Sequence, residues 1–280
     1  LTLKGLRWMF ERIPFVFSGS LCGFISLYGL ILKKKAMEVH YPLRTWLVIL
    51  ILFSTAGILG QQIPTRNMVI GDGMSSNYVT GITQDKYGFM WFATRHGVNR
   101  FDGNKFTVYV KDHRQTTLNS NDIARITSDT LNNRIWIANR WDGINVFDCE
   151  TQTFSSFMHD PENNTSLSSN EIKDILVTAA GNIWIATAAA LGVDKPGHEP
   201  FAPLHRSTLP GLPTDYISTL AEGRNGNIYN GHPQEGMSNL SRKDHSIRNF
   251  RNRPGDKSSL PGNTVNAIYT GMKSKIWIAT

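Results

Sequence analysis

The residue types in this chain that could bind a ligand are arginine, histidine and tryptophan in three short polar segments. The segments are Arg95-His96, Arg140-Trp141-Asp142 and the single residue His232. A guanidinium group forms charge-assisted hydrogen bonds, and an exposed aromatic ring provides a flat surface for stacking. Together they could bind a polar or acidic glycan. An alternative stays open, in which Arg140 and Trp141 only pair or pack at the edge of a sheet.

No group of residues has the pattern of a catalytic or metal site. The eight histidines occur singly, and neither H-E-x-x-H nor C-x-x-C spacing is present. The sequence also lacks the G-x-S-x-G elbow of a serine hydrolase and the P-loop of a nucleotide-binding enzyme. We therefore predict that these residues form no enzyme active site and bind neither a metal ion nor a cofactor.

The elements that would position the three segments are copies of one short pattern. Four copies and a weaker one each contain an aromatic residue, and successive aromatic residues are 45 or 48 residues apart. These residues are Trp91, Trp136, Trp184, Tyr229 and Trp277. A fixed period in this range is typical of a repeat architecture.

Each repeat has the pattern of four short antiparallel strands. Apolar residues alternate in the first two strands, and Gly and Asn between them suit a hairpin turn. Third strands are expected at 97–102, 143–148 and 192–195, and fourth strands at 105–110, 153–157 and 247–250. No segment has the apolar stripe of a helical repeat. We predict an all-β fold, an incomplete β-propeller ring of about 4.5 four-stranded antiparallel blades.

The aromatic residue of each second strand is interpreted as a packing residue between neighbouring blades. Burying an indole ring removes about 150–250 Å² from water, which is worth roughly 4–6 kcal/mol as an upper estimate. We prefer this interpretation to a sugar-stacking role, because every repeat carries the residue at the same place.

The connections between blades also repeat, at 116–121, 165–170, 209–215 and 258–263. In an antiparallel blade, the turn between strands two and three emerges on the same face as the connection to the next blade. That face should gather Arg95, His96, Arg140, Trp141 and His232, and loops on a rigid scaffold are where ligands bind. We therefore expect the ligand site on this face.

Three carboxylates, Asp122, Glu171 and Asp215, stand at the starts of first strands. Glycoside hydrolysis needs two carboxyl groups at a defined separation, so these residues could serve an enzyme. We interpret them as polar caps beside the connections. A carbohydrate-active propeller enzyme, a lyase or a glycosidase, is kept as the alternative function.

The combination of an S-L-x-x-N connection, a W-I-A-T second strand and a G-[IV]-N-x-F-D third strand resembles the two-component regulator propeller repeats. These repeats occur in the periplasmic sensor region of hybrid two-component histidine kinases. The resemblance covers about residues 62–280. It implies two seven-bladed propellers, an immunoglobulin-like connector, a membrane helix and a kinase core, often followed by a receiver and a DNA-binding domain.

Two features of this chain depart from the family pattern. In the fourth repeat, Tyr229-Asn-Gly replaces the tryptophan strand and the segment 236–244 replaces the third strand. The sequence stops at Thr280, within a fifth W-I-A-T strand, so we expect a fragment of a sensor without its kinase.

The formal net charge of +7 is concentrated before the repeats. Residues 1–60 contain seven lysines and arginines against Glu11 and Glu38, so a nucleic-acid footprint on the repeats is not supported. Residues 37–60 are predicted to be a signal peptide or membrane anchor. Residues 1–36 are either upstream sequence, which we favour, or a membrane segment. Cys149 is alone within 61–280, so no intramolecular disulfide is expected.

We predict that residues 61–280 are part of a propeller sensor domain on the periplasmic side of the inner membrane. It would detect an oligosaccharide or another small ligand and pass the signal to a histidine kinase. Its other expected partners are further propeller blades, the kinase part of the full-length chain and a second copy in a homodimer, with no nucleic acid.

Overall fold

The computed structural model describes residues 67–112, 117–194, 202–271 and 275–280. They belong to one compact unit, Arg66–Thr280. The segments 1–36 and 37–60 lie outside the described residues, so their predicted roles are not tested by the structure. Within the described part of the chain, no helix is long and apolar enough to cross a membrane.

The unit contains four four-stranded antiparallel sheets and one two-stranded sheet, which confirms the predicted all-β propeller blades. A 3-10 turn, η1 (Ile70–Asp72), precedes the first sheet. Blade 1 consists of β1 (Val79–Gln84), β2 (Met90–Thr94), β3 (Gly97–Phe101) and β4 (Phe106–Tyr109). Blade 2 consists of β5 (Ile123–Asp129), β6 (Arg134–Asn139), β7 (Ile144–Asp148) and β8 (Thr153–Phe157).

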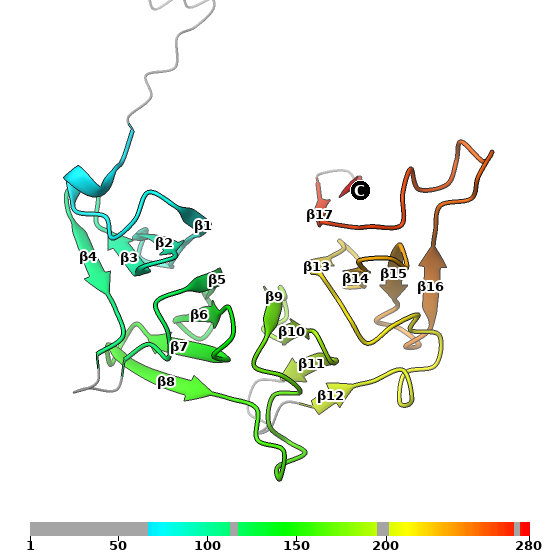
Figure 1. Ribbon diagram of the computed structural model, residues 1–280, viewed down its shortest axis with the longest axis horizontal. Coiled ribbons are helices and arrows are strands. Elements are labelled where there is room, and N and C mark those ends of the chain that lie inside the picture. The colour runs from blue at the N-terminus through cyan, green and yellow to red at the C-terminus, as the bar shows by residue number, and fades with distance from the viewer. Residues whose placement is uncertain (1–66, 113–116, 195–201, 272–274) are drawn as a thin grey trace, which may run out of the picture. The chain divides into compact units, whose positions relative to one another are not determined.

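Blade 3 consists of β9 (Ile172–Val177), β10 (Ile183–Thr187), β11 (Leu191–Asp194) and β12 (Ala202–Leu204). Blade 4 consists of β13 (Thr219–Glu222), β14 (Ile228–Gly231), β15 (Met237–Leu240) and β16 (Ile247–Phe250), and the two-stranded sheet consists of β17 (Ala267–Thr270) and β18 (Ile276–Ala279). Consecutive strands are neighbours in every sheet, with the first strand inside and the fourth outside (Figure 1).

Local sequence explains the hairpin between the first two strands of each complete blade. One residue of the turn has a positive φ, and it is a glycine or an asparagine in each case, as these turns require. The residues are Gly88, Asn133, Gly181 and Gly226. Blade 4 forms a regular sheet although its second strand lacks the tryptophan, because Tyr229 takes the same place opposite Ala221.

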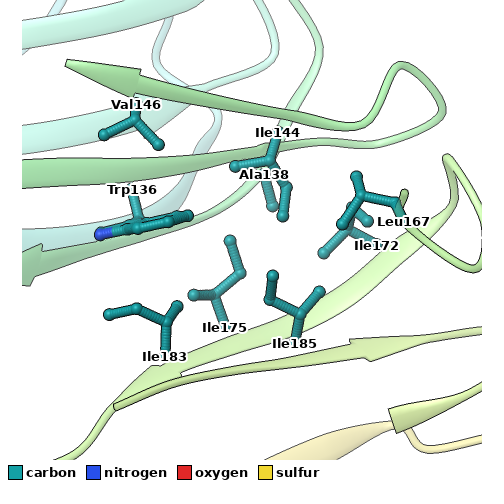
Figure 2. Close-up of a cluster of buried hydrophobic side chains, with 9 residues drawn as sticks. All are labelled: Trp136, Ala138, Ile144, Val146, Leu167, Ile172, Ile175, Ile183 and Ile185. Carbon is teal, nitrogen blue, oxygen red and sulfur yellow. The ribbon is translucent and has the colours of Figure 1, made fainter. Parts of the chain in front are cut away.

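The core lies between the blades, where the aromatic residue of one second strand packs on the next sheet. Trp136 belongs to one buried cluster with four isoleucines of blade 3, Ile172, Ile175, Ile183 and Ile185, and Ile175 and Ile183 lie on the side of its ring (Figure 2). Trp91 packs on blade 2, Trp184 on blade 4, and Tyr229 on β17 and β18. Trp277 of β18 is 64% exposed. The packing of neighbouring blades removes apolar surface from water, which is the main contribution to the stability of the folded chain.

Three of the four connections between blades are fastened to the blade that they leave by the asparagine before the next first strand. The side-chain oxygen of Asn170 accepts the N–H of His159, which lies two residues beyond β8, at 2.7 Å. Its backbone oxygen accepts the N–H of Gly143, at the start of β7, at 3.0 Å. We call this pair of hydrogen bonds the connection clamp, and Asn121 and Asn263 form the same clamp in blades 1 and 4.

The close approach of the fourth strand explains the glycine at or just before the start of the third strand in blades 1, 2 and 4. Gly143 has φ +68°, and a Cβ atom there would lie 2.3 Å from the backbone oxygen of Phe157. Gly97 and Gly236 are in the same situation, at 2.4 and 2.2 Å from the corresponding oxygens. No side chain fits at this point.

We expect Trp136→Ala to lower the free energy of unfolding by about 3–5 kcal/mol, since it leaves a cavity between blades 2 and 3. The matched control is Trp277→Ala, which removes an exposed indole and should cost less than about 1 kcal/mol. Urea unfolding followed by circular dichroism measures both. Equal losses would contradict the packing role.

We expect Gly143→Ala to destabilise the chain more than Gly103→Ala. Gly103 also has a positive φ, +97°, but nothing lies within 4 Å of a Cβ there, so its cost is the strain alone, about 1–2 kcal/mol. Thermal melts of the two variants separate the strain of a positive φ from the clash with Phe157. Similar melting temperatures would contradict the clash.

Candidate ligand-binding site

A cavity of about 510 Å³ lies where the first strands of the four complete blades begin. We call it the inner-strand cavity. It is lined by Tyr78, Val79, Thr80, Ala124, Arg125, Arg140, Trp141, Glu171, Ile172, Lys173 and Ser218. Its volume is within the range that holds small-molecule ligands, roughly 300–1,000 Å³.

β-Bulges in the first strands shape this cavity. The pairing of the first with the second strand skips one residue in each of blades 1, 2 and 3, and these residues are Thr80, Ala124 and Lys173. All three line the cavity. Bulges re-aim side chains that would otherwise alternate along a strand. The register shift therefore directs the bulged residues toward the cavity.

Each of the three cations that line the cavity has a carboxylate partner. Arg140 Nε donates to Asp122 Oδ2 at 2.9 Å, and Arg125 Nε lies 3.6 Å from Asp174 Oδ1. Lys173 Nζ contacts Glu171 Oε1. The positive charge of the cavity is thus compensated by Glu171 in its wall and by Asp122 and Asp174 behind it.

Aromatic rings surround Lys173. Its Nζ lies 5.0 Å from the centre of the Tyr216 ring and 5.9 Å from that of Trp141, distances at which a cation is attracted to a ring face. Burial alone lowers the pKa of Lys173, but hydrogen bonds to Glu171 and Tyr216 outweigh it and raise that pKa. The ammonium stays charged, and Trp141 beside it is 60% exposed.

The structure separates Arg95 and His96 from the residues that line the cavity. Arg95 lies 4.1 Å above the ring of Tyr78, which does line the cavity, so it is a neighbour of the site. His96 is exposed in the turn between β2 and β3, and its N–H donates to Thr94. Of the predicted contact residues, Arg140 and Trp141 are the two that line the cavity.

His232, which the sequence grouped with the contact residues of this face, is fully buried. Its Nδ1 lies 3.1 Å from the backbone oxygen of Tyr216, and its Nε2 lies 2.9 Å from Ser238 Oγ. A carbonyl only accepts, so Nδ1 carries the proton and the Ser238 hydroxyl donates to Nε2. Burial lowers the pKa of His232 and keeps it neutral.

The three carboxylates considered for an enzyme have structural contacts. Asp122 pairs with Arg140, and Glu171 pairs with Lys173. Asp215 accepts the backbone N–H of Arg206 at 2.6 Å, the same side-chain contact that Asn170 makes in its clamp. Among the described residues, no group of three or more His, Cys, Asp or Glu side chains is placed to hold a metal ion.

Sequence reasoning did not identify Tyr78, Arg125 or Lys173 as site residues. The available signal was a charged residue inside an otherwise apolar first strand, as at Arg125 and Lys173. A propeller places its first strands at the inner side, so such a charge faces the inner-strand cavity.

A second cavity of about 460 Å³ lies between blades 3 and 4, near the turns of the opposite face. Trp184, Ile228, Leu240, Arg242 and His245 are among the residues that line it. Because none of the predicted contact residues lies there, we take the inner-strand cavity as the candidate site.

Comparison with known proteins agrees with the fold and the repeats. A family model described as two component regulator propeller matches residues 73–96 and 166–189. The extracellular domain of the hybrid two-component system BT3049 from B. thetaiotaomicron is 34% identical, with a TM-score of 0.68. The match covers 76% of this chain and 29% of that one.

Two further relatives are similar over smaller parts or at lower identity. The extracellular domain of the one component system BT4673 from B. thetaiotaomicron shares the fold at 18% identity and a TM-score of 0.60, over 78% of this chain and 30% of that one. Histidine kinase P4 of Formosa agariphila is 44% identical over 46 residues, 16% of this chain and 3% of that protein. The chain thus spans under a third of each relative.

Fold and comparisons together define a β-propeller. Two of its repeats, at 73–96 and 166–189, match the two-component regulator propeller model, as their sequence pattern indicated.

Asp174 joins three blades beside the cavity. Its carboxylate contacts Arg125 of blade 2 and accepts the backbone N–H of Leu220 and the hydroxyl of Thr219 from blade 4, at 2.8 and 3.1 Å. Burial raises the pKa of Asp174, and these partners oppose the rise only in part.

A carboxyl whose pKa is raised by folding contributes stability below its unfolded pKa, and this contribution is lost as the pH rises through the folded pKa. The unmodified chain should therefore lose stability relative to Asp174→Asn as the pH rises from about 4 to about 7. We expect the melting temperature of the variant minus that of the unmodified chain to increase over this range. Calorimetric scans at several pH values measure this difference. A flat or falling difference would contradict the assignment.

Proposed function

We propose that this chain is the ligand-sensing part of an extracytoplasmic sensor of a two-component system, and that a glycan binds in its inner-strand cavity. The observation that carries the proposal is an exposed indole, Trp141, beside paired cations in a cavity between four first strands. The similarity to the extracellular domain of a hybrid two-component system supports the sensor role.

The same comparison supports a periplasmic location, with the propeller outside the inner membrane and a histidine kinase elsewhere in the full-length protein. Residues 37–60 would then export the chain or anchor it. The enzyme alternative receives no support from the cavity, because Glu171 in its lining and Asp122, the partner of Arg140, are both held in ion pairs.

Exposed apolar side chains support contacts of the propeller with further blades. Ile82 on β1 is 56% exposed, and Tyr269 and Trp277 on the two-stranded sheet are 68% and 64% exposed. In blades 1 to 4 the second-strand residue that corresponds to Trp277 packs against the next sheet. Further blades of the same kind, and a homodimer of the full-length protein, are part of the proposal.

We expect at least one member of an oligosaccharide panel to bind the full chain, because the site combines an aromatic surface with polar side chains. Isothermal titration calorimetry should give a saturable heat, and the melting temperature should rise with ligand concentration. A panel of broad composition that gives neither heat nor thermal shift would sink the proposal.

A further inference from the structure

Charge in the inner-strand cavity is balanced before any ligand enters. Arg125, Arg140 and Lys173 each contact a carboxylate of the wall or of the layer behind it. A ligand carboxylate or sulfate would therefore have to displace one of these partners or lie beside it, where like charges repel each other. The cavity thus offers no unpaired cation to an acidic ligand among its lining residues.

The ion pairs still have hydrogen-bonding capacity to spare. An ammonium has three donors and a guanidinium five, whereas each carboxylate has two acceptor oxygens. Lys173 and Glu171 both line the cavity, and only one contact joins them. Arg140 adds donors to the wall, whereas its partner Asp122 lies behind the lining and the second oxygen of Asp122 is buried. Donors and acceptors therefore stand next to each other in the wall at Lys173 and Glu171. A hydroxyl group, which both donates and accepts, matches such a wall.

An apolar surface accompanies these polar groups. Trp141 is 60% exposed and Tyr78 is 55% exposed, and both line the cavity together with Val79 and Ile172. Flat aromatic faces of this kind suit a ligand ring with an apolar face and a polar rim.

We infer that the inner-strand cavity selects a neutral, hydroxyl-rich saccharide over an acidic one. Trp141 provides the stacking surface, and the Lys173–Glu171 pair together with the donors of Arg140 binds the ring hydroxyls. The inference rests on the proposed function and narrows it, because residue types alone also admitted acidic glycans.

Calorimetry with the full chain compares neutral hexasaccharides of glucose, mannose and xylose with hexamers of galacturonate. We expect a neutral hexasaccharide to bind with a Kd that does not change between about 0.05 and 0.5 M salt, since no net charge is exchanged. The galacturonate hexamer should bind at least about tenfold more weakly, about 1.4 kcal/mol.

Variants assign the binding to this cavity. Trp141→Ala should weaken binding at least about tenfold, and Trp141→Phe, which keeps a flat ring, should restore most of it. Glu171→Gln leaves one cation uncompensated, so it should lower the preference for neutral over acidic saccharide by at least about threefold. Glu162→Gln, an exposed carboxylate in a connection, is the matched control and should leave the preference unchanged.

The possible failures are distinguishable. Tighter binding of galacturonate, weakened by salt and by Trp141→Ala, would overturn the neutral selectivity and leave the proposed function standing. Neutral binding that is indifferent to Trp141→Ala would overturn the assignment to this cavity. No binding by any saccharide would overturn both the inference and the proposed function.

Discussion

A four-stranded sheet of this size can bury its apolar side chains only against the sheet beside it, and every other feature of the molecule depends on that constraint. Trp136 and the isoleucines of blade 3 show how it is met, because the second strand of one blade and the first two strands of the next share one core. Small sheets are marginal in isolation, so stability resides in these contacts between blades. The same contacts keep the first strands side by side and thereby place the cavity between them.

Polar contacts fix the positions of the connections and of the starts of the first strands, which apolar packing between blades does not determine. The connection clamp at Asn170 holds the chain between β8 and β9, so the start of β9 is fixed where the bulge at Lys173 occurs. Side chains also join first strands directly. Thr80 donates to the backbone oxygen of Ile123 and Ser218 to that of Val265, and both thus connect neighbouring blades at the cavity. The residues that line the cavity and the residues that hold neighbouring blades together therefore lie in the same short segments, at the starts of the first strands.

Much of the fold could be predicted from the sequence, because its signals are local. Alternating apolar residues identify the strands and glycine or asparagine identifies the turns, each within a few residues. The regular spacing of Trp91 and its equivalents identifies the repeat. The site was predicted only in part. Topology alone placed Arg140 and Trp141 on the face where both line the inner-strand cavity, whereas the bulge at Lys173 depends on pairing with β10. His232 lies in the turn between β14 and β15, as expected, but its contacts with Tyr216 and Ser238 bury it, and a sequence pattern does not reveal such contacts. The outer strand β12 was missed because only three residues form it.

Amide hydrogen exchange of the full chain, with and without a saturating saccharide, tests the central claim most directly. Exchange rates report local opening residue by residue, so they show where a ligand orders the backbone. If the inner-strand cavity is the site, protection should increase at Thr80, Ala124 and Lys173 and in the turn that carries Trp141. Protection confined to the residues around Trp184 and Arg242, which line the cavity of the opposite face, would contradict the account.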